Sequence, residues 1–251
     1  MADVTLAVPV YNSAPFLDEL FACLRSLDPV PAQIVFLDDA STDDSASHLA
    51  TIAADLGGRT SVTVLRNERN LGIAGTYNRL VREARGEWIQ LLDADDLLVE
   101  SDYFDRVEPA LIEDNDLVVT ALDSDARLLG RTSRLFKRLV PKRPPIWWPL
   151  LGSFATRAGV LYRRQCLLDT PFPNPAYPGS DVIHLLELRQ RGHCLYLRNP
   201  NVFYRIHENA QSSRVLDYSV YRKELIRFPR AVRWAYGLDL CLRRLGQRWV
   251  R

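Results

Sequence analysis

Three aspartates crowd together directly after an apolar run in the stretch WIQLLDADDLLVE, residues 88–100. Asp93, Asp95 and Asp96 occupy three of four consecutive positions. Like charges this close disfavour joint ionisation unless a cation neutralises them. Carboxylate oxygens are hard ligands that suit Mg²⁺ or Mn²⁺, and such ions keep coordination positions for water and phosphate oxygens. The triplet therefore indicates a divalent-metal site that would bind a diphosphate and stabilise charge developing on a departing phosphate.

The same triplet has a plainer explanation. Most Asp-x-Asp triplets are solvated loops or helix caps, and Asp95 or Asp96 could cap a helix over residues 97–107. Polar residues at the ends of other predicted strands favour the metal site over that alternative.

Apolar runs and helical periodicity alternate along the first half of the chain. Strands are predicted at 4–10, 33–39, 61–67 and 87–96, with helices at 13–27, 41–58 and 74–86. This alternation predicts an α/β fold with a doubly wound, mostly parallel sheet. Ligands of such sheets bind outside the carboxyl ends of the strands. Polar residues follow three of these ends, and we expect them to converge on one crevice: Tyr11 and Asn12, Asp38 and Asp39, and the aspartate triplet.

The overall composition is that of an ordinary globular protein. The 251 residues are 47% hydrophobic and 25% charged, and the net charge of +1 names no partner. Four scattered cysteines without CxxC spacing argue against a zinc site or a disulfide framework and fit a reducing compartment. No apolar stretch approaches the ~18 residues of a membrane helix, and the N-terminus is a poor signal peptide. We therefore expect a cytoplasmic protein.

The C-terminal segment 222–251 is strongly basic. It contains nine Lys and Arg residues and two acidic residues, which gives the segment a net charge of +7. The remaining residues 1–221 therefore have a net charge of −6. Leucines and a tryptophan spaced by three and four residues predict an amphipathic helix. Such a helix could lie on the inner membrane face, which would suit a lipid-linked acceptor, or dock on the acidic remainder of the chain. Nothing in the sequence indicates nucleic-acid binding, because no recognition motif accompanies the basic residues.

Four motifs in order resemble glycosyltransferase family 2: VTLAVPVYN, IVFLDDASTDDS, LRNERNLGIAGTYNRLVREARGEWIQLLDADD and GSDVIHLLELRQRGHCLYLRNPNVFYRIHENAQSS. The resemblance implies the GT-A fold, within which 1–125 would be the nucleotide-sugar-binding half and 126–215 the acceptor-binding half, followed by a helical tail over 216–251. It implies a metal-dependent inverting enzyme that moves one sugar from a nucleotide-diphosphate sugar to an acceptor hydroxyl in a single displacement. The cofactor would be Mn²⁺ or Mg²⁺.

The resemblance also assigns the donor side. Tyr11 would stack on the base, and Asp38 or Asp39 would accept a hydrogen bond from the base ring, which favours a UDP-sugar. The structural alternatives are that Tyr11 packs on the sheet edge and that Asp39 begins a turn. Asp95 would be the main metal ligand. The implied nucleotide-sugar contacts are Pro9, Tyr11, Asn12, Asp38, Asp39, Asn70, Gly72, Asn78, Asp93, Ala94 and Asp95, and the metal ligands Asp93, Asp95, Asp96 and His207.

On the acceptor side, the resemblance makes Asp181 the general base that removes the proton of the acceptor hydroxyl. Ser180 stands where the family often has Glu, and the alternative is that Ser180 or Asp181 only caps the following helix. Trp147 and Trp148 could stack on an acceptor or belong to the core. Arg205 could pair with phosphate oxygens.

Two departures from the family pattern bear on the mechanism. Thr76-Tyr77-Asn78 replaces a frequent Ala-Arg-Asn, so that arginine contact has no counterpart unless Arg79 or Arg82 substitutes for it. The Gln-x-x-Arg-Trp motif of processive members is absent, which favours the addition of one sugar per encounter.

The residues fit two other functions less well. A nucleotidyltransferase would need a Gly-rich, Lys- or Arg-bearing loop after the first strand, and VPVYNSAP offers none. An inactive nucleotide-sugar-binding or membrane-docking module would have no need of Asp93, Asp95, Asp181 and His207 together.

Overall fold

The computed structural model describes residues 2–124, 141–145, 157–173, 176, 180–205 and 223–232. Its centre is one eight-stranded sheet with the strand order β3-β2-β1-β4-β7-β6-β8-β5. The first four strands are parallel, as predicted: β1 (Val4–Val10), β2 (Gln33–Asp38), β3 (Ser61–Arg66) and β4 (Trp88–Leu91). The helices between them also match the prediction: α1 (Ala14–Ser26), α2 (Ser45–Leu56) and α3 (Gly72–Glu83).

The second half of the sheet is mixed rather than parallel. Strand β7 (Val160–Arg163) runs antiparallel to both β4 and β6 (Leu117–Ser124). Strand β8 (Cys194–Tyr204) is parallel to β6 and antiparallel to the short β5 (Leu97–Leu98). The remaining helices are α4 (Tyr103–Leu111), α6 (Arg164–Asp169) and α7 (Ser180–Arg191). Apolar patterning predicts a strand but not its direction, which depends on how the chain returns to the sheet.

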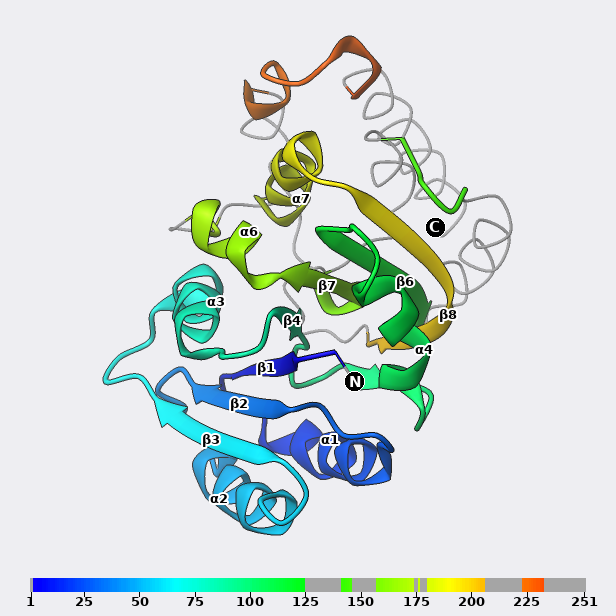
Figure 1. Ribbon diagram of the computed structural model, residues 1–251. Coiled ribbons are helices and arrows are strands. Elements are labelled where there is room, and N and C mark those ends of the chain that lie inside the picture. The colour runs from blue at the N-terminus through cyan, green and yellow to red at the C-terminus, as the bar shows by residue number, and fades with distance from the viewer. Residues whose placement is uncertain are drawn as a thin grey trace, which may run out of the picture.

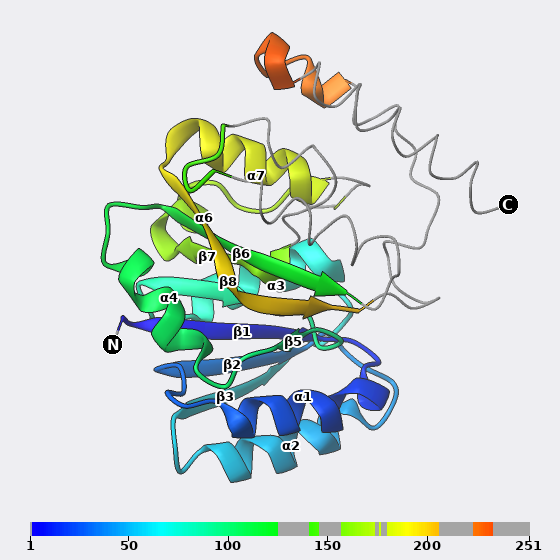
Figure 2. The ribbon, with the colours of Figure 1, turned by 90° about the vertical axis from the view of Figure 1, so that its right-hand side faces the viewer.

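Helices cover both faces of the sheet, which explains why its inner strands are apolar throughout. Every residue of β1, β2 and β4 is buried, whereas the edge strand β3 is partly exposed. Side chains of β1 alternate between two cores. Leu6 and Val8 pack in a cluster with α1, α2 and α4, and Ala7 packs in a cluster with α3, α6 and α7. Figures 1 and 2 show α1 and α2 together on one side of the strands and α7 on the other.

One predicted element differs at the aspartate triplet. The strand expected over 87–96 ends at Leu91, and the helix considered for 97–107 begins only at Tyr103. Leu97 and Leu98 instead pair with Phe203 and Val202 of β8. Neither Asp95 nor Asp96 therefore caps a helix, because a strand follows the turn that contains them.

The tail prediction can be compared only over 223–232, the described part of segment 222–251. There, Leu225, Phe228 and Val232 are buried, and Arg227 forms an ion pair of 2.9 Å with Glu187 of α7. These contacts agree with docking of this part on the domain. None of the helices formed by the described residues combines the length and the apolar character needed to cross a membrane.

We predict that Gly86→Ala destabilises the fold by roughly 1–3 kcal/mol, the usual cost of overpacking. A Cβ at Gly86 would lie 2.8 Å from the Asp3 carbonyl oxygen and 2.8 Å from the Thr5 nitrogen, and backbone atoms of β1 cannot easily shift. Urea denaturation measures the loss. Gly58→Ala is the matched control, since a Cβ at Gly58 meets nothing within 4 Å; equal stability of the two variants would contradict the prediction.

Candidate functional site

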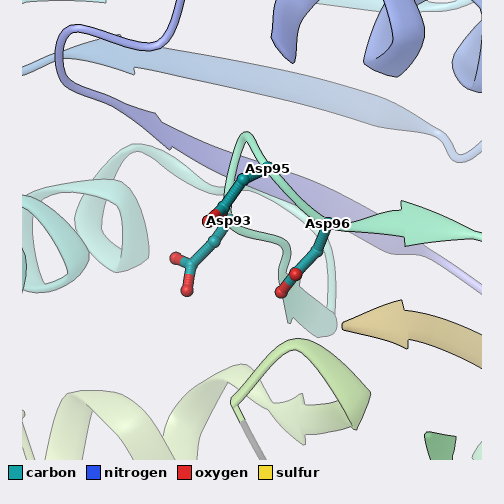
Figure 3. A group of neighbouring side chains, drawn as sticks. All are labelled: Asp93, Asp95 and Asp96. Carbon is teal, nitrogen blue, oxygen red and sulfur yellow. The ribbon is translucent and has the colours of Figure 1, made fainter. Parts of the chain in front are cut away.

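Three carboxylates project from the turn that follows β4. The candidate ligand atoms of Asp93, Asp95 and Asp96 all lie within 4.8 Å of one another. Figure 3 shows the three side chains leaving this turn toward the same side. Asp96 is buried, and the other two are half-buried. The sequence prediction that these residues gather at a strand end is therefore matched by the geometry.

Main-chain contacts hold this turn in place. The Leu92 N–H donates to the Ala7 carbonyl of β1 at 3.1 Å, and the Asp96 N–H closes the turn on the Asp93 carbonyl at 3.0 Å. Ala94, an expected nucleotide-sugar contact, is buried at the centre of the turn. The carboxylates are therefore fixed to the end of the buried parallel sheet.

Arg205, at the end of β8, holds the same turn from the other side. Its N–H donates to Asp96 Oδ1 at 3.0 Å, and its Nε donates to the Asp95 carbonyl at 3.1 Å. Its Nη2 donates to Glu19 of α1 at 2.6 Å. These contacts make Arg205 a clamp between β8, α1 and the aspartate turn, and its pairing with phosphate oxygens stays a prediction.

Tyr77 of α3 is a site residue that sequence reasoning missed. It is buried, and its hydroxyl donates a hydrogen bond to Asp93 Oδ1. Tyr77 stands where the related family often has arginine. Arg79, considered as a substitute for that arginine, instead donates to the carbonyl of Arg66 and the side chain of Asn67. The signal in the sequence was the departure from Ala-Arg-Asn at Thr76-Tyr77-Asn78, which puts a tyrosine hydroxyl at this position.

The ends of β1 and β2 are joined to each other by side chains. The Asn12 N–H donates to Ser41 Oγ at 2.9 Å, and Asn12 Oδ1 accepts from the Thr42 N–H at 2.8 Å. Asn12 has a positive φ of 49°. Tyr11 beside it is 50% exposed, so its ring is available to a ligand at this edge. Pro9 is buried within β1.

Asp38 and Asp39 have different surroundings, although both are buried. Asp38 Oδ1 accepts from the Ser41 N–H at 2.9 Å. Its Oδ2 has no hydrogen bond from any described residue and lies 3.4 Å from Arg66 Nη1. Asp39 directly follows β2, and its carboxylate accepts hydrogen bonds from N–H groups at the start of α3.

The carboxylate of Asp39 fixes the beginning of helix α3. Its Oδ1 accepts from Asn67 Nδ2 at 2.6 Å and from the Leu71 N–H at 2.8 Å, and its Oδ2 accepts from the Gly72 N–H at 3.0 Å. An anion at a helix N-terminus satisfies N–H groups that the helix itself leaves open. Asn70 Oδ1 also accepts from the Gly72 N–H, at 2.8 Å. Gly72 has a φ of +71°, which favours glycine there.

Asn78 has structural contacts rather than an open amide. Its Nδ2 donates to the Phe172 carbonyl at 2.8 Å, and its Oδ1 accepts from the Phe172 N–H at 2.9 Å. Both hydrogen-bonding groups of this expected nucleotide-sugar contact thus attach the segment after α6 to α3.

Asp181 lies half-buried in the first turn of α7, after the buried Ser180. Residues three apart share a helix face, so Asp181 and His184 do so. The His184 ring is 4.1 Å from the Phe172 ring, centroid to centroid, and the Phe172 ring is 5.2 Å from that of Tyr77. Tyr77 in turn bonds to Asp93. A series of ring contacts and one hydrogen bond thus connects His184 of α7 with the aspartate turn.

Three other expected residues, Trp147, Trp148 and His207, lie outside the described residues.

The aspartate turn fits a divalent cation by its donor set. Its ligand atoms are carboxylate oxygens, the type that Mg²⁺ and Mn²⁺ prefer, and they are close enough to share one ion. A cation there would offset the repulsion among the three charges.

Comparison with known proteins identifies relatives. The model of the family described as "Glycosyl transferase family 2" matches residues 5–169, more than half of the chain. The succinoglycan biosynthesis protein ExoO of Rhizobium meliloti is 30% identical over 143 residues, 57% of this chain and 39% of ExoO. The uncharacterized glycosyltransferase EpsJ of Bacillus subtilis is 27% identical over 222 residues, 79% of this chain and 62% of EpsJ. The chain thus spans less than two thirds of either relative's length.

Solved structures share the fold. S. aureus TarS 1–349 in complex with UDP-GlcNAc matches with a TM-score of 0.72 at 18% identity, over 96% of this chain and 72% of that one. The mannosyltransferase PcManGT from Pyrobaculum calidifontis, in complex with GDP-Man and Mn²⁺, matches with a TM-score of 0.65 at 18% identity, over 95% and 73%. This likeness establishes the GT-A fold predicted from the sequence.

We predict that Asp39→Ala destabilises the protein by on the order of 3 kcal/mol, because the buried Asn67 amide and the N–H groups of Leu71 and Gly72 lose a charged acceptor. Urea denaturation measures the change. Asp18→Ala is the control: the Asp18 side chain is 92% exposed, and we expect its removal to change stability by no more than about 0.5 kcal/mol. If Asp39→Ala lost no more stability than Asp18→Ala, the conclusion that Asp39 fixes the start of α3 would be wrong.

Proposed function

The chain belongs to glycosyl transferase family 2, and from that premise we propose that it moves one sugar from a nucleotide-diphosphate sugar to an acceptor hydroxyl with inversion. The observation that carries this proposal is the aspartate turn at the carboxyl end of β4, with candidate ligand atoms within 4.8 Å of one another. Inversion follows from a single in-line displacement, in which the hydroxyl attacks the face opposite the diphosphate.

The nucleotide would occupy the ends of β1 and β2. Tyr11 exposes half of its surface there and offers a ring on which a base can stack, an interaction of roughly 1–3 kcal/mol per base. Asp38 is the proposed acceptor of a hydrogen bond from a base N–H, because its Oδ2 accepts none from a described residue, whereas the Asp39 carboxylate already accepts from Asn67, Leu71 and Gly72. A uracil imide suits such an acceptor, so a UDP-sugar is the favoured donor. Structural neighbours bind UDP-GlcNAc and GDP-Man, which supports a nucleotide sugar without choosing the base.

The diphosphate would lie at the aspartate turn. Asp95 is the proposed main ligand of a divalent cation, with Asp93 and Asp96 beside it, and the bound ion would stabilise the negative charge that develops on the departing diphosphate. The role of the chain is to hold these oxygens in place. The Asp96 N–H, the Ala7 carbonyl and Arg205 fix the turn before any ligand arrives. Mn²⁺ accompanies the nucleotide sugar in PcManGT, which agrees with this assignment.

The acceptor hydroxyl would lose its proton to Asp181. This carboxylate shares a face of α7 with His184, whose ring stacks on Phe172 and, through it, on Tyr77 beside the aspartate turn. The stack therefore supports a position for Asp181 across from the diphosphate. Its place in the first turn of a helix gives it a fixed backbone. The basic charge of segment 222–251 favours a lipid-linked acceptor.

We predict that UDP binds with Mn²⁺ present and that chelation of the metal or Asp95→Asn weakens this binding at least tenfold, because the diphosphate would lose the cation that offsets its negative charge. Isothermal titration calorimetry with UDP, GDP and TDP, each with Mn²⁺ or EDTA, provides the measurement. Asp105→Asn, at an exposed carboxylate in the first turn of α4, is the control. If all three nucleotides bound as tightly in EDTA as with Mn²⁺, the metal assignment would be contradicted.

We predict that Asp181→Asn retains nucleotide affinity while its turnover falls by about 10²–10⁴-fold, the usual effect of losing a general base. Asp105→Asn removes the same charge from the first turn of another helix and should leave turnover unchanged. Sugar transfer or donor hydrolysis, measured with a sugar nucleotide found by screening, tests the expectation. An unaltered rate in Asp181→Asn would remove this residue from the mechanism.

A further inference from the structure

Tyr77 brings its hydroxyl to the aspartate turn from a buried position in α3. Its side chain is 1% exposed, and its hydroxyl donates to Asp93 Oδ1. Burial of a polar hydroxyl is costly unless it is hydrogen-bonded. Here the acceptor is a carboxylate of the candidate cation site, which gives the contact a consequence beyond stability.

The ring of Tyr77 is held by its neighbours, so the hydroxyl has a defined direction. The Phe172 ring lies 5.2 Å from the Tyr77 ring, centroid to centroid, at an interplanar angle of 41°, and the His184 ring lies 4.1 Å from that of Phe172. Asn78, the residue after Tyr77, bonds to both the N–H and the carbonyl of Phe172. This arrangement immobilises the aromatic partner of Tyr77 and thereby Tyr77 itself.

The hydrogen bond also acts on the electrostatics of the turn. Three carboxylates within 4.8 Å repel one another, and that repulsion would turn the Asp93 side chain away from its neighbours. A donor on Oδ1 stabilises the charged form and fixes the plane of the carboxylate, which sets the direction of Oδ2. Partners of this kind orient metal ligands and tune their affinity in known metal sites.

We propose that Tyr77 is a positioning residue of the cation-and-diphosphate site, which acts by orienting Asp93 through its hydroxyl. This inference rests on the proposed function, because it concerns the same aspartate turn. It gives a role to the position at which this chain departs from the arginine frequent in its family. Tyr77 contacts Asp93 rather than the reacting atoms, so it is not a catalytic residue.

The test compares Mn²⁺ affinity in the wild type and in Tyr77→Phe, measured by electron paramagnetic resonance of free Mn²⁺ with and without UDP. Tyr77→Phe keeps the ring against Phe172 and removes only the hydroxyl. We expect Mn²⁺ to bind about 10–100-fold more weakly, the usual effect of losing a partner of a metal ligand. Unchanged Mn²⁺ affinity in Tyr77→Phe would overturn the proposal.

Tyr103→Phe is the matched control, because Tyr103 is also fully buried and hydrogen-bonded. Its hydroxyl accepts from Gln90 at 2.8 Å and contacts Thr120 at 3.2 Å. Thermal melting should show a loss of stability in both variants, whereas only Tyr77→Phe should lose Mn²⁺ affinity. Equal losses of Mn²⁺ affinity in both would mean a general effect of stability and would overturn the proposal.

A double variant separates orientation of Asp93 from other effects. If Tyr77 acts through Asp93, Tyr77→Phe should cause no further loss of Mn²⁺ affinity in an Asp93→Asn background. Additive losses would contradict this route. Absence of Mn²⁺ binding by the wild type, with and without UDP, would instead refute the metal site of the proposed function, a result distinguishable from failure of Tyr77→Phe alone.

Discussion

Repulsion among three carboxylates at the end of β4 is the constraint to which the surrounding structure responds. Two unit charges about 5 Å apart repel by roughly 3 kcal/mol at an effective dielectric constant of about 20. The Tyr77 hydroxyl donates to the Asp93 carboxylate and the Arg205 N–H donates to that of Asp96, while the Asp96 N–H closes the turn on the Asp93 carbonyl. These donors hold the carboxylates together in a position that a divalent cation would complete.

Several residues expected to contact the nucleotide sugar also have partners within the protein. Asn12 joins the loops after β1 and β2, Asp39 fixes the start of α3, and Asn78 of α3 attaches the segment at Phe172. A rigid frame of this kind reduces the ordering that binding would otherwise require. Tyr11, half-exposed at the same edge, contrasts with these residues, because its ring has surface to offer.

The site has contributions from distant parts of the chain. The aspartate turn belongs to the parallel half of the sheet, whereas Phe172, His184 and Asp181 come from the segment that follows the antiparallel β7. The aromatic stack of Tyr77, Phe172 and His184 joins these two parts. The parts that carry the proposed donor-side and acceptor-side groups are thereby packed together, as the proposed single displacement requires.

The sequence by itself determined the first four strands, the three helices between them and the gathering of aspartates after β4, because local apolar periodicity and strand-end chemistry encode these features. Only the tertiary structure decided the antiparallel direction of β7, the clamp formed by Arg205 and the bond from Tyr77 to Asp93. It also separated Asp38 from Asp39, which are adjacent and chemically identical in the sequence but have different partners. Such contacts join residues far apart in the chain, and local sequence patterns carry no information about which distant groups will meet.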